Sequence, residues 1–377
     1  MTEPPPFHVL AKPRGAICDL ACAYCYYLDK EALYPGSLFR MTDAVLERYI
    51  VQTFAASRTP VVTFAWQGGE PTLAGLAFFE RAVALQERHR PAGVAVANTL
   101  QTNAVSLDDD WCRFFNEHDF LVGVSLDGPK HLHDAYRVDK AGRPTFDRVL
   151  AGLERLARHG VEANILTTLH AANALYPLEV YRFLRDTIGA RYLQFIPIIE
   201  RVGAEGVSAR SITAGQYGTF LIAVFDEWLR HDLGRVFVQI FDVALAVWYG
   251  QPAGLCIFEE TCGRALALEH TGDLYSCDHF VDPAHRLGRI DERDLIELVA
   301  DPRQTAFGQA KRDALPRYCR ECEVRFMCNG GCPKDRFALT PTGEPGLNVL
   351  CAGYRAFFNH IDTPMRRMAA ALRRQDA

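Results

Sequence analysis

The amino-acid sequence predicts an α/β fold built on a parallel sheet. From residue 7 to about 200, short β-like runs alternate with amphipathic stretches of helical periodicity. Several of the runs are almost continuously apolar, which is typical of strands buried on both faces. Repeated strand–helix–strand units form right-handed crossovers and so place their strands parallel. There are six such runs, fewer than the eight of a complete TIM barrel, so the pattern leaves a partial barrel and an open doubly wound sheet as alternatives.

The elements of this fold can be placed along the chain from their composition and end signals. The expected strands are residues 7–13, 61–66, 94–103, 120–128, 161–169 and 191–199. The expected helices are residues 42–56, 76–89, 146–160 and 177–189. Thr42 is a suitable N-cap for the first helix, and Gly160 and Gly189 are suited to ending the last two.

Polar and glycine-rich segments end several of the expected strands. They are "FAWQGGEP" at 64–71, "LQTN" at 100–103 and "VSLDGP" at 124–129. A strand-to-helix turn with Pro71 at its first helical position would explain the first segment structurally. However, the ends of parallel strands meet on one rim, and Gly68 and Gly69 would let the backbone approach a ligand there. The sequence therefore predicts a binding site at this rim.

Bulk properties exclude several classes of protein. The chain has 377 residues, a length that favours one large domain and a smaller one. Its net charge of −5 does not show the excess of basic residues that is typical of nucleic-acid-binding proteins. The N-terminus lacks the pattern of a secretory signal, and no apolar run reaches the roughly 18 residues of a membrane helix. We therefore expect a cytoplasmic protein with no nucleic-acid or membrane partner.

In a reducing compartment the twelve cysteines point to metal binding or catalysis rather than to disulfides. Cys18, Cys22 and Cys25 follow the first expected strand with the spacing C-x3-C-x2-C. A structural zinc site would need a fourth ligand, and His8 lies too early for a compact knuckle. A [4Fe–4S] cluster held by three thiolates would keep one iron open for a small molecule. Cys112, alone in a helical stretch, is interpreted as a buried apolar residue.

A second group of eight cysteines lies near the C-terminus, enough for two complete four-thiolate sites. Its members are Cys256, Cys262, Cys277, Cys319, Cys322, Cys328, Cys332 and Cys351. Spacing does not decide how they are divided, and zinc and iron–sulfur clusters are both compatible with it. Before them, residues 263–280 have the alternation of a hairpin around Gly272.

The triplet, an aromatic residue at Tyr24 and the "GGEP" strand end together resemble the radical S-adenosylmethionine enzymes. The resemblance implies a partial (β/α)6 TIM-like barrel over residues 1–235. It also implies that S-adenosylmethionine chelates the open iron through its amino and carboxylate groups. One-electron reduction then releases a 5′-deoxyadenosyl radical.

The same resemblance assigns residues to the cosubstrate. Gly68, Gly69 and Glu70, with Gln67 beside them, would receive the methionyl amino group. Ser125 and Arg137 would hold its carboxylate, and Tyr24 would lie near the adenine. Two residues depart from the family pattern, because Asp19 stands where Asn is frequent and Ala104 where Gly is frequent.

The later cysteines resemble the twin-cluster SPASM extension, which implies a smaller α+β cysteine-rich domain over residues 236–377 that ends in a C-terminal helix. The resemblance assigns two fully ligated [4Fe–4S] clusters to this domain, and the natural role of such clusters is to carry electrons. With the cluster of the N-terminal triplet, the chain would hold three. Auxiliary cluster I would be held by Cys256, Cys262, Cys277 and Cys332. Auxiliary cluster II would be held by Cys319, Cys322, Cys328 and Cys351.

Within that group the chain resembles the anaerobic sulfatase-maturating enzymes through segments such as "LVGVSLDGP", "SCDHF" and "NGGCPKDRF". This implies oxidation of a Cys or Ser side chain of a sulfatase to Cα-formylglycine. It implies Asp278 as the base and an electron donor such as flavodoxin or ferredoxin. Two alternatives are a radical maturase that crosslinks a ribosomal peptide and a non-catalytic redox protein. The 17 residues before Cys18 would leave no room for a leader-peptide domain, which favours the sulfatase reading over the first alternative.

Overall fold

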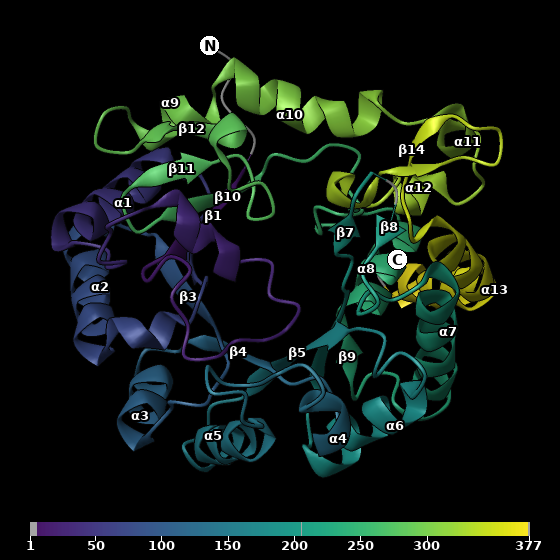
Figure 1. The fold of residues 1–377 in the computed structure, drawn as a ribbon, viewed down its shortest axis with the longest axis horizontal. Coiled ribbons are helices and arrows are strands. Elements are labelled where there is room, and N and C mark those ends of the chain that lie inside the picture. The colour runs from purple at the N-terminus through teal and green to yellow at the C-terminus, as the bar shows by residue number, and fades with distance from the viewer. Residues whose placement is uncertain (1–5, 205, 376–377) are drawn as a thin grey trace. The chain divides into compact units, whose positions relative to one another are not determined.

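The computed structural model describes residues 6–204 and 206–375, which form two compact units. The first unit contains residues 6–125, 137–163 and 263–308, and the second contains the remaining described residues. Figure 1 labels the elements of both. The units are interleaved along the chain, because residues 263–308 return to the unit that contains the N-terminal strand.

The first unit is organised by a sheet with the strand order β12-β11-β10-β1-β2-β3-β4. Strands β10 and β1 to β4 run parallel, and β11 and β12 add two antiparallel strands beyond β10. The strands are β1 (His8–Lys12), β2 (Val61–Trp66), β3 (Ala95–Thr102), β4 (Leu121–Ser125), β10 (Ala265–Glu269), β11 (Asp273–Tyr275) and β12 (Arg286–Arg289). Its helices are α1 (Asp43–Ala56), α2 (Leu76–His89), α3 (Asp109–Glu117), α5 (Phe146–Arg158) and α9 (Leu295–Val299), with the short turns η1 (Leu28–Leu33), η2 (Pro71–Ala74) and η4 (Pro283–His285).

Helices α1 to α3 follow strands β1 to β3 and lie along the same side of the sheet (Figure 1). Aromatic side chains fill the layer between helices and sheet. Trp66 packs edge-on against Tyr49 of α1 and against Phe78 and Phe79 of α2. Its indole N–H donates to Asn98 of β3 at 2.9 Å, so the one polar atom of this ring is satisfied inside the core. This packing holds Trp66, the last residue of β2, against α1, α2 and the middle of β3.

The second unit holds the parallel strands β5-β6-β9 and most of the late cysteines. Its strands are β5 (Ala163–Leu169), β6 (Tyr192–Pro197), β9 (Phe237–Val238) and the small pairs β7 (Arg201–Val202) with β8 (Gly206–Val207) and β13 (Ala338–Leu339) with β14 (Pro345–Leu347). Its helical elements are α4 (Lys130–His133), α6 (Pro177–Arg182), η3 (Phe183–Thr187), α7 (Ala214–His231), α8 (Gln239–Tyr249), α11 (Arg317–Arg320), α12 (Arg325–Cys328), η5 (Pro333–Asp335) and α13 (Cys351–Gln375). Helix α10 (Pro302–Asp313) begins in the first unit and ends in the second.

Helices α7 and α13 cross closely in the second unit. A Cβ atom at Gly353 would lie 2.2 Å from the carbonyl oxygen of Ala214, and one at Gly218 would lie 3.0 Å from the Cα of Gly353. The two glycines therefore permit this crossing, which fixes the start of α13 at Cys351. A predicted cluster ligand is thus placed by a helix-packing contact.

The six expected strands correspond to β1 to β6, and the four expected helices are also present, so these predictions are confirmed. Thr42 caps α1 by accepting a hydrogen bond from Val45 N, and Gly160 and Gly189 have φ of 71° and 72°. Cys112 is fully buried, as expected. The hairpin around Gly272 is also present as β10 and β11, but its parallel pairing with β1 was not foreseen. The domain boundary at residue 235 stays a prediction, because the two compact units are interleaved along the chain and are not divided at a single position.

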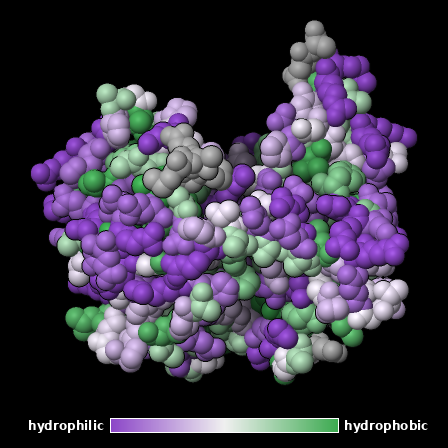
Figure 2. Space-filling view, turned by 90° about the horizontal axis from the view of Figure 1, so that it is seen from above, coloured by the Kyte–Doolittle hydropathy of each residue, from purple (hydrophilic) through white to green (hydrophobic). Residues whose placement is uncertain are grey.

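One face of the molecule is mainly hydrophilic (Figure 2). Figure 2 shows one face, on which purple hydrophilic side chains predominate and green apolar ones are scattered between them. No helix within residues 6–204 and 206–375 has both the length and the apolar character needed to cross a membrane.

Candidate active site and cluster ligands

The cysteine triplet lies in the loop that follows β1, and all three side chains are half-buried. Donors point at the sulfur of Cys18: the backbone N of Leu20 lies 3.3 Å from it and Asn103 Nδ2 lies 3.7 Å from it. Burial raises the pKa of the Cys18 thiol, so a proton would occupy this sulfur in the absence of a metal. Hydrogen bonds to sulfur tune iron–sulfur clusters, and this environment fits a cluster ligand.

Asp19 links the triplet loop to the end of β3. Its carboxylate accepts a hydrogen bond from Asn103 Nδ2 at 2.7 Å and another from Ser106 Oγ at 2.9 Å. Ala104, the other departure from the family pattern, has φ of 60° and is fully buried. The turn after β3 therefore requires the left-handed backbone that glycine would adopt more easily.

The glycines after β2 permit a close approach to β1 and to the triplet loop. Gly68 and Gly69 have φ of 87° and 43°. A Cβ at Gly69 would lie 2.1 Å from the carbonyl oxygen of Ile17, and one at Gly68 would lie 2.2 Å from Lys12 Cδ. Glu70 N donates to Ile17 O at 2.8 Å. A side chain at Gly69 would therefore move the backbone of the loop that carries the triplet, whereas one at Gly68 would displace the side chain of Lys12.

The carboxylate of Glu70 is buried among hydrogen-bond donors. Oε1 accepts from Thr72 N, Thr72 Oγ1 and Thr102 Oγ1 at 2.8 to 3.0 Å, and Oε2 accepts from Asn103 N at 2.8 Å. Burial raises the pKa of Glu70 to about 7, against the effect of these hydrogen bonds. Oε2 accepts one of these hydrogen bonds and has capacity for one more donor.

The residues assigned to the other end of the cosubstrate lie in the same unit. Ser125 ends β4 and accepts a hydrogen bond from Gln101 Nε2 at 3.1 Å. The Arg137 guanidinium lies 5.5 Å from the centre of the Tyr24 ring, and its Nη1 is 4.0 Å from Cys22 Sγ. The structure thus brings Tyr24 and Arg137 together beside the triplet.

A buried ion pair joins Asp278 to the rim. Lys12 Nζ contacts the Asp278 carboxylate and also donates to Gln67 Oε1 at 3.1 Å. The Tyr26 hydroxyl donates to the other oxygen of Asp278. The two side chains of the pair are 1% and 11% exposed. Burial alone would raise the pKa of Asp278, but the charges of Lys12 and His279 and these hydrogen bonds hold it below its ordinary value.

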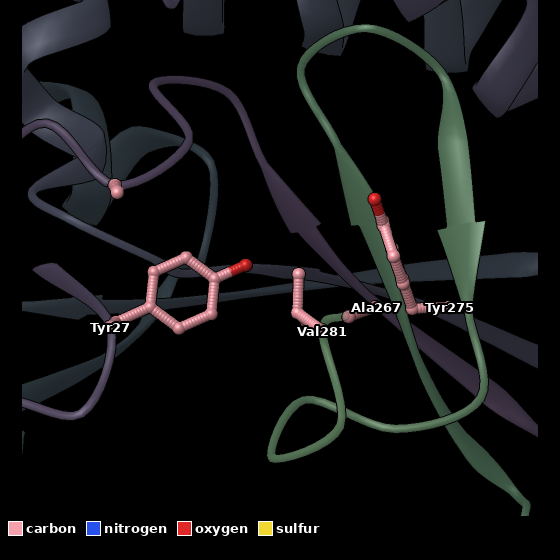
Figure 3. Close-up of a cluster of buried hydrophobic side chains, with 5 residues drawn as sticks. Tyr27, Ala267, Tyr275 and Val281 are labelled. Atoms are coloured by element: carbon pink, nitrogen blue, oxygen red, sulfur yellow. The ribbon is translucent and has the colours of Figure 1, made fainter. Parts of the chain in front are cut away.

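The surroundings of this pair are apolar. Lys12 Nζ lies 4.5 Å above the Tyr27 ring. Tyr27 packs with Ala16, Ala267, Tyr275 and Val281, and Figure 3 shows its ring pointing toward Val281 next to the β10–β11 hairpin. Cys25 packs against the same cluster. Cys25 of the triplet and Lys12 therefore contact the same hydrophobic cluster, and this low-dielectric environment strengthens the electrostatic interactions of the ion pair.

Lys12, Tyr26 and Asn103 were not among the candidate residues from the sequence. A lysine inside the apolar run "HVLAKP" was a usable signal, since a charged residue is rarely buried without a partner. Nothing local in the sequence indicated Tyr26, because its partner lies 252 positions away.

In the second unit, the four cysteines assigned to auxiliary cluster II line one recess. They are Cys319, Cys322, Cys328 and Cys351. Burial raises the pKa of Cys328 to about 12 and that of Cys351 to about 11. The set assigned to auxiliary cluster I is divided, with Cys256, Cys262 and Cys332 in the second unit and Cys277 in the first.

Among the described residues, no three His, Cys, Asp or Glu side chains converge closely enough to hold a single metal ion. The thiolates of a [4Fe–4S] cluster each bind a different iron, so they stand farther apart than the ligands of one ion. Four thiols around one recess, Cys319 buried and the other three half-buried, therefore fit a cluster.

Comparison with known proteins gives the family. The sequence model of the Radical SAM superfamily matches residues 13–184, and that of the iron-sulfur cluster-binding domain SPASM matches residues 256–323. The serine-type anaerobic sulfatase-maturating enzyme of Bacteroides thetaiotaomicron is 43% identical over 99% of this chain and 93% of its own length. This chain belongs to the anaerobic sulfatase-maturating enzyme family. Its cofactors are S-adenosylmethionine and [4Fe–4S] clusters, as the cysteine pattern predicted.

Other family members are similar along the whole chain. The cysteine-type anaerobic sulfatase-maturating enzyme of Clostridium perfringens (strain 13 / Type A) is 33% identical over 94% of this chain and 96% of its own length. The solved structure of native anSMEcpe with bound AdoMet and Cp18Cys peptide has a TM-score of 0.89 and 32% identity, covering 98% of this chain and 100% of that one. These matches confirm the predicted fold class, an α/β radical enzyme with a SPASM extension.

Proposed function

We propose that this chain oxidises a Ser or Cys side chain in a sulfatase polypeptide to Cα-formylglycine. The observation that carries the proposal is the position of Asp278. Its carboxylate follows a predicted cluster ligand, Cys277, and is joined through Lys12 to Gln67 at the end of β2. A base between the cosubstrate rim and an electron-accepting cluster is the arrangement that this oxidation needs.

The proposed chemistry removes two electrons and two protons in total: one hydrogen atom from the target Cβ, then one electron together with the proton of its hydroxyl or thiol. When bound, the triplet's cluster and S-adenosylmethionine supply the radical that takes one hydrogen atom. Asp278 takes the proton of the hydroxyl or thiol as the second electron leaves, which gives the aldehyde from Ser. From Cys the same step gives a thioaldehyde, and water then replaces sulfide. Lys12 and Tyr26 hold the Asp278 carboxylate ionised and oriented before the proton arrives.

The other site residues are proposed to bind and orient the cosubstrate. The backbone of Gly68 and Gly69, with Glu70 Oε2 and with Gln67 beside it, would receive its amino group. Ser125 and Arg137 would hold its carboxylate. The Tyr24 ring, fixed by its contact with Arg137, would lie against the adenine.

Electrons are proposed to leave through the two auxiliary clusters in the ligand sets assigned above. An external protein such as flavodoxin or ferredoxin would reduce the triplet's cluster. Because such clusters and free thiols persist in a reducing compartment, we place the reaction in the cytoplasm.

Asp278→Asn tests the proposal. The anaerobically purified variant, with full iron content, should release 5′-deoxyadenosine from S-adenosylmethionine but convert a sulfatase-motif peptide to formylglycine at least 10²-fold less than the parent. Asp282→Asn is the matched control, because Asp282 lies four residues away and pairs with His285 on the surface. Mass spectrometry of the peptide measures the product. Near-normal formylglycine from Asp278→Asn would place the base elsewhere.

Serine is the target to test first. The relative that is 43% identical is named serine-type, whereas the one that is 33% identical is named cysteine-type. Paired peptides that differ only in Ser or Cys at the target position decide between them.

A further inference from the structure

Two positive charges lie among the late cysteines without a carboxylate partner. Lys311 of α10 is 1% exposed, and Arg336, after η5, is half-buried. All their hydrogen bonds go to backbone carbonyl oxygens. Neither side chain forms an ion pair with Asp or Glu in the part of the chain that the structure describes. Because a buried charge normally requires a counter-charge, another group has to supply one.

The segment between Cys328 and Cys332 is built around the Arg336 guanidinium. Its three residues adopt left-handed backbone conformations, with φ of 45° at Asn329, 74° at Gly330 and 63° at Gly331. This turns their carbonyl oxygens onto Arg336, at 2.6, 2.9 and 3.1 Å in the same order. A Cβ at Gly330 would lie 2.7 Å from Arg336 Nη2, so the guanidinium occupies the space that a side chain would fill. Cys328 and Cys332 are assigned to different clusters, and one arginine sets the path between them.

Lys311 organises a second cysteine segment. Its Nζ donates to the carbonyl oxygens of Cys256 at 2.7 Å and Ile257 at 3.0 Å, and also to that of Glu259. Arg336 Nη1 in turn donates to the backbone carbonyl of Lys311. The two cations are therefore neighbours, and together they contact segments that carry ligands of both predicted clusters.

The thiols of both sets act electrostatically on this pair. Burial lowers the pKa of Arg336, while thiolate charge at Cys319, Cys328, Cys332 and Cys262 acts in the opposite direction. Burial and the charge of Arg336 lower the pKa of Lys311 to about 8, again against thiolates, here at Cys262, Cys256 and Cys332. The hydrogen bonds of Lys311 to Cys256 O and of Arg336 to the carbonyl oxygens of residues 329–331 place both cations beside the cluster cysteines.

We propose that Arg336 and Lys311 are a shared counter-charge for the two auxiliary clusters and raise the reduction potentials of both. A cluster with four thiolates is anionic, and reduction adds a further negative charge. A fixed positive charge nearby favours the reduced form, since net charge and hydrogen bonding set these potentials. The inference rests on the proposed ligand sets. In it, both residues act on electron transfer through the two clusters and do not touch the substrate.

The test is a redox titration followed by electron paramagnetic resonance. The parent is the full chain with Cys18→Ala, Cys22→Ala and Cys25→Ala, so that only auxiliary clusters contribute to the signal. Arg336→Gln or Lys311→Met in this parent should shift the midpoints to more negative potential. We expect about tenfold less reduced cluster at a fixed potential, which corresponds to about 59 mV for one electron. Arg312→Gln is the matched control, because Arg312 adjoins Lys311 but is 40% exposed and pairs with Asp313.

Unchanged midpoints at full iron content in Arg336→Gln and Lys311→Met would overturn the inference. If Arg336→Gln loses iron, Arg336→Lys decides, since it keeps the charge without the planar set of donors. Retained iron and a parent-like midpoint in Arg336→Lys support a role of charge, whereas iron loss there too shows a purely structural role and overturns it. Failure of the proposed function would look different: the parent itself would hold no iron at these cysteines, or the unmutated enzyme would make no formylglycine.

Discussion

Lys12 Nζ contacts the carboxylate of Asp278 across 266 positions of sequence. The pairing of β1 with β10 produces this contact, because the parallel register that sets Lys12 opposite Glu269 brings the hairpin and the segment after it to the end of β1. A residue from the cysteine-rich part of the sequence is thereby built into the rim that carries the "GGE" segment.

Lys12→Met should separate S-adenosylmethionine cleavage from product formation. Removing one partner of a buried ion pair leaves the other charge uncompensated, which costs about 3–5 kcal/mol of stability. The variant should still release 5′-deoxyadenosine, because Lys12 does not touch the triplet, but its formylglycine yield should fall. Thermal unfolding and mass spectrometry of the peptide measure the two effects.

The double variant Lys12→Met/Asp278→Leu is the control for stability. Apolar replacement of both partners should restore most of the stability lost in the single variant, yet formylglycine should stay absent because the base is gone. A double variant that makes product would show that the pair serves stability alone.

The cysteine triplet and the strand ends could be read from the sequence because their signals are local. Spacing identified the triplet, and composition located Gly68, Gly69 and Glu70 at a strand end. The partners of Asp278 could not be found in this way. Lys12 and Tyr26 acquire their partner only when β10 pairs with β1, and no short-range pattern encodes that pairing. Likewise, nothing local in the sequence distinguishes Arg336 and Lys311 from other basic residues. The structure distinguishes them, because they lie buried or half-buried and form no ion pair with a carboxylate within the described residues.

The triple variant Cys18→Ala/Cys22→Ala/Cys25→Ala should lose all 5′-deoxyadenosine release while it keeps the auxiliary clusters. Three [4Fe–4S] clusters give about twelve iron atoms per chain, so about eight should remain. Iron and zinc analysis of the anaerobic protein provides the measurement. Zinc bound at the late cysteines would favour a structural zinc site there over the iron–sulfur clusters. Continued 5′-deoxyadenosine release would show that the triplet is not the site of cleavage.

Glu70 should make the enzyme less stable as pH rises in the absence of S-adenosylmethionine. Burial raises the folded-state pKa of Glu70 to about 7 from its ordinary value of 4.5, so the folded state binds the proton more tightly than the unfolded state. The resulting stability is present at low pH and is lost as pH rises from about 4.5 to 7. At 1.36 kcal/mol per pKa unit the loss is at most about 3 kcal/mol.

Glu70→Gln lacks this titration, so its unfolding free energy should be flatter over the same pH range. Denaturant unfolding of both proteins at several pH values, with clusters intact and no cosubstrate, makes the comparison. Parallel pH profiles for the two proteins would contradict the assignment of a raised pKa to Glu70.

Gly330→Ala should disturb the auxiliary clusters more than its backbone strain alone explains. Any L-residue at φ of 74° costs about 1 kcal/mol. At Gly330 the new Cβ would also lie 2.5 Å from Leu315 Cδ2 and 2.7 Å from Arg336 Nη2, and Leu315 is buried. The guanidinium is the more mobile neighbour, so it should move and release the carbonyl oxygens between Cys328 and Cys332.

Gly343→Ala is the matched control, because Gly343 has φ of 85° but no atom within 4 Å of its Cβ position. Gly330→Ala should therefore lose iron from the late cysteines, whereas Gly343→Ala should keep it and lose only about 1 kcal/mol of stability. Equal iron content in the two variants would show that the "NGG" turn does not depend on the guanidinium.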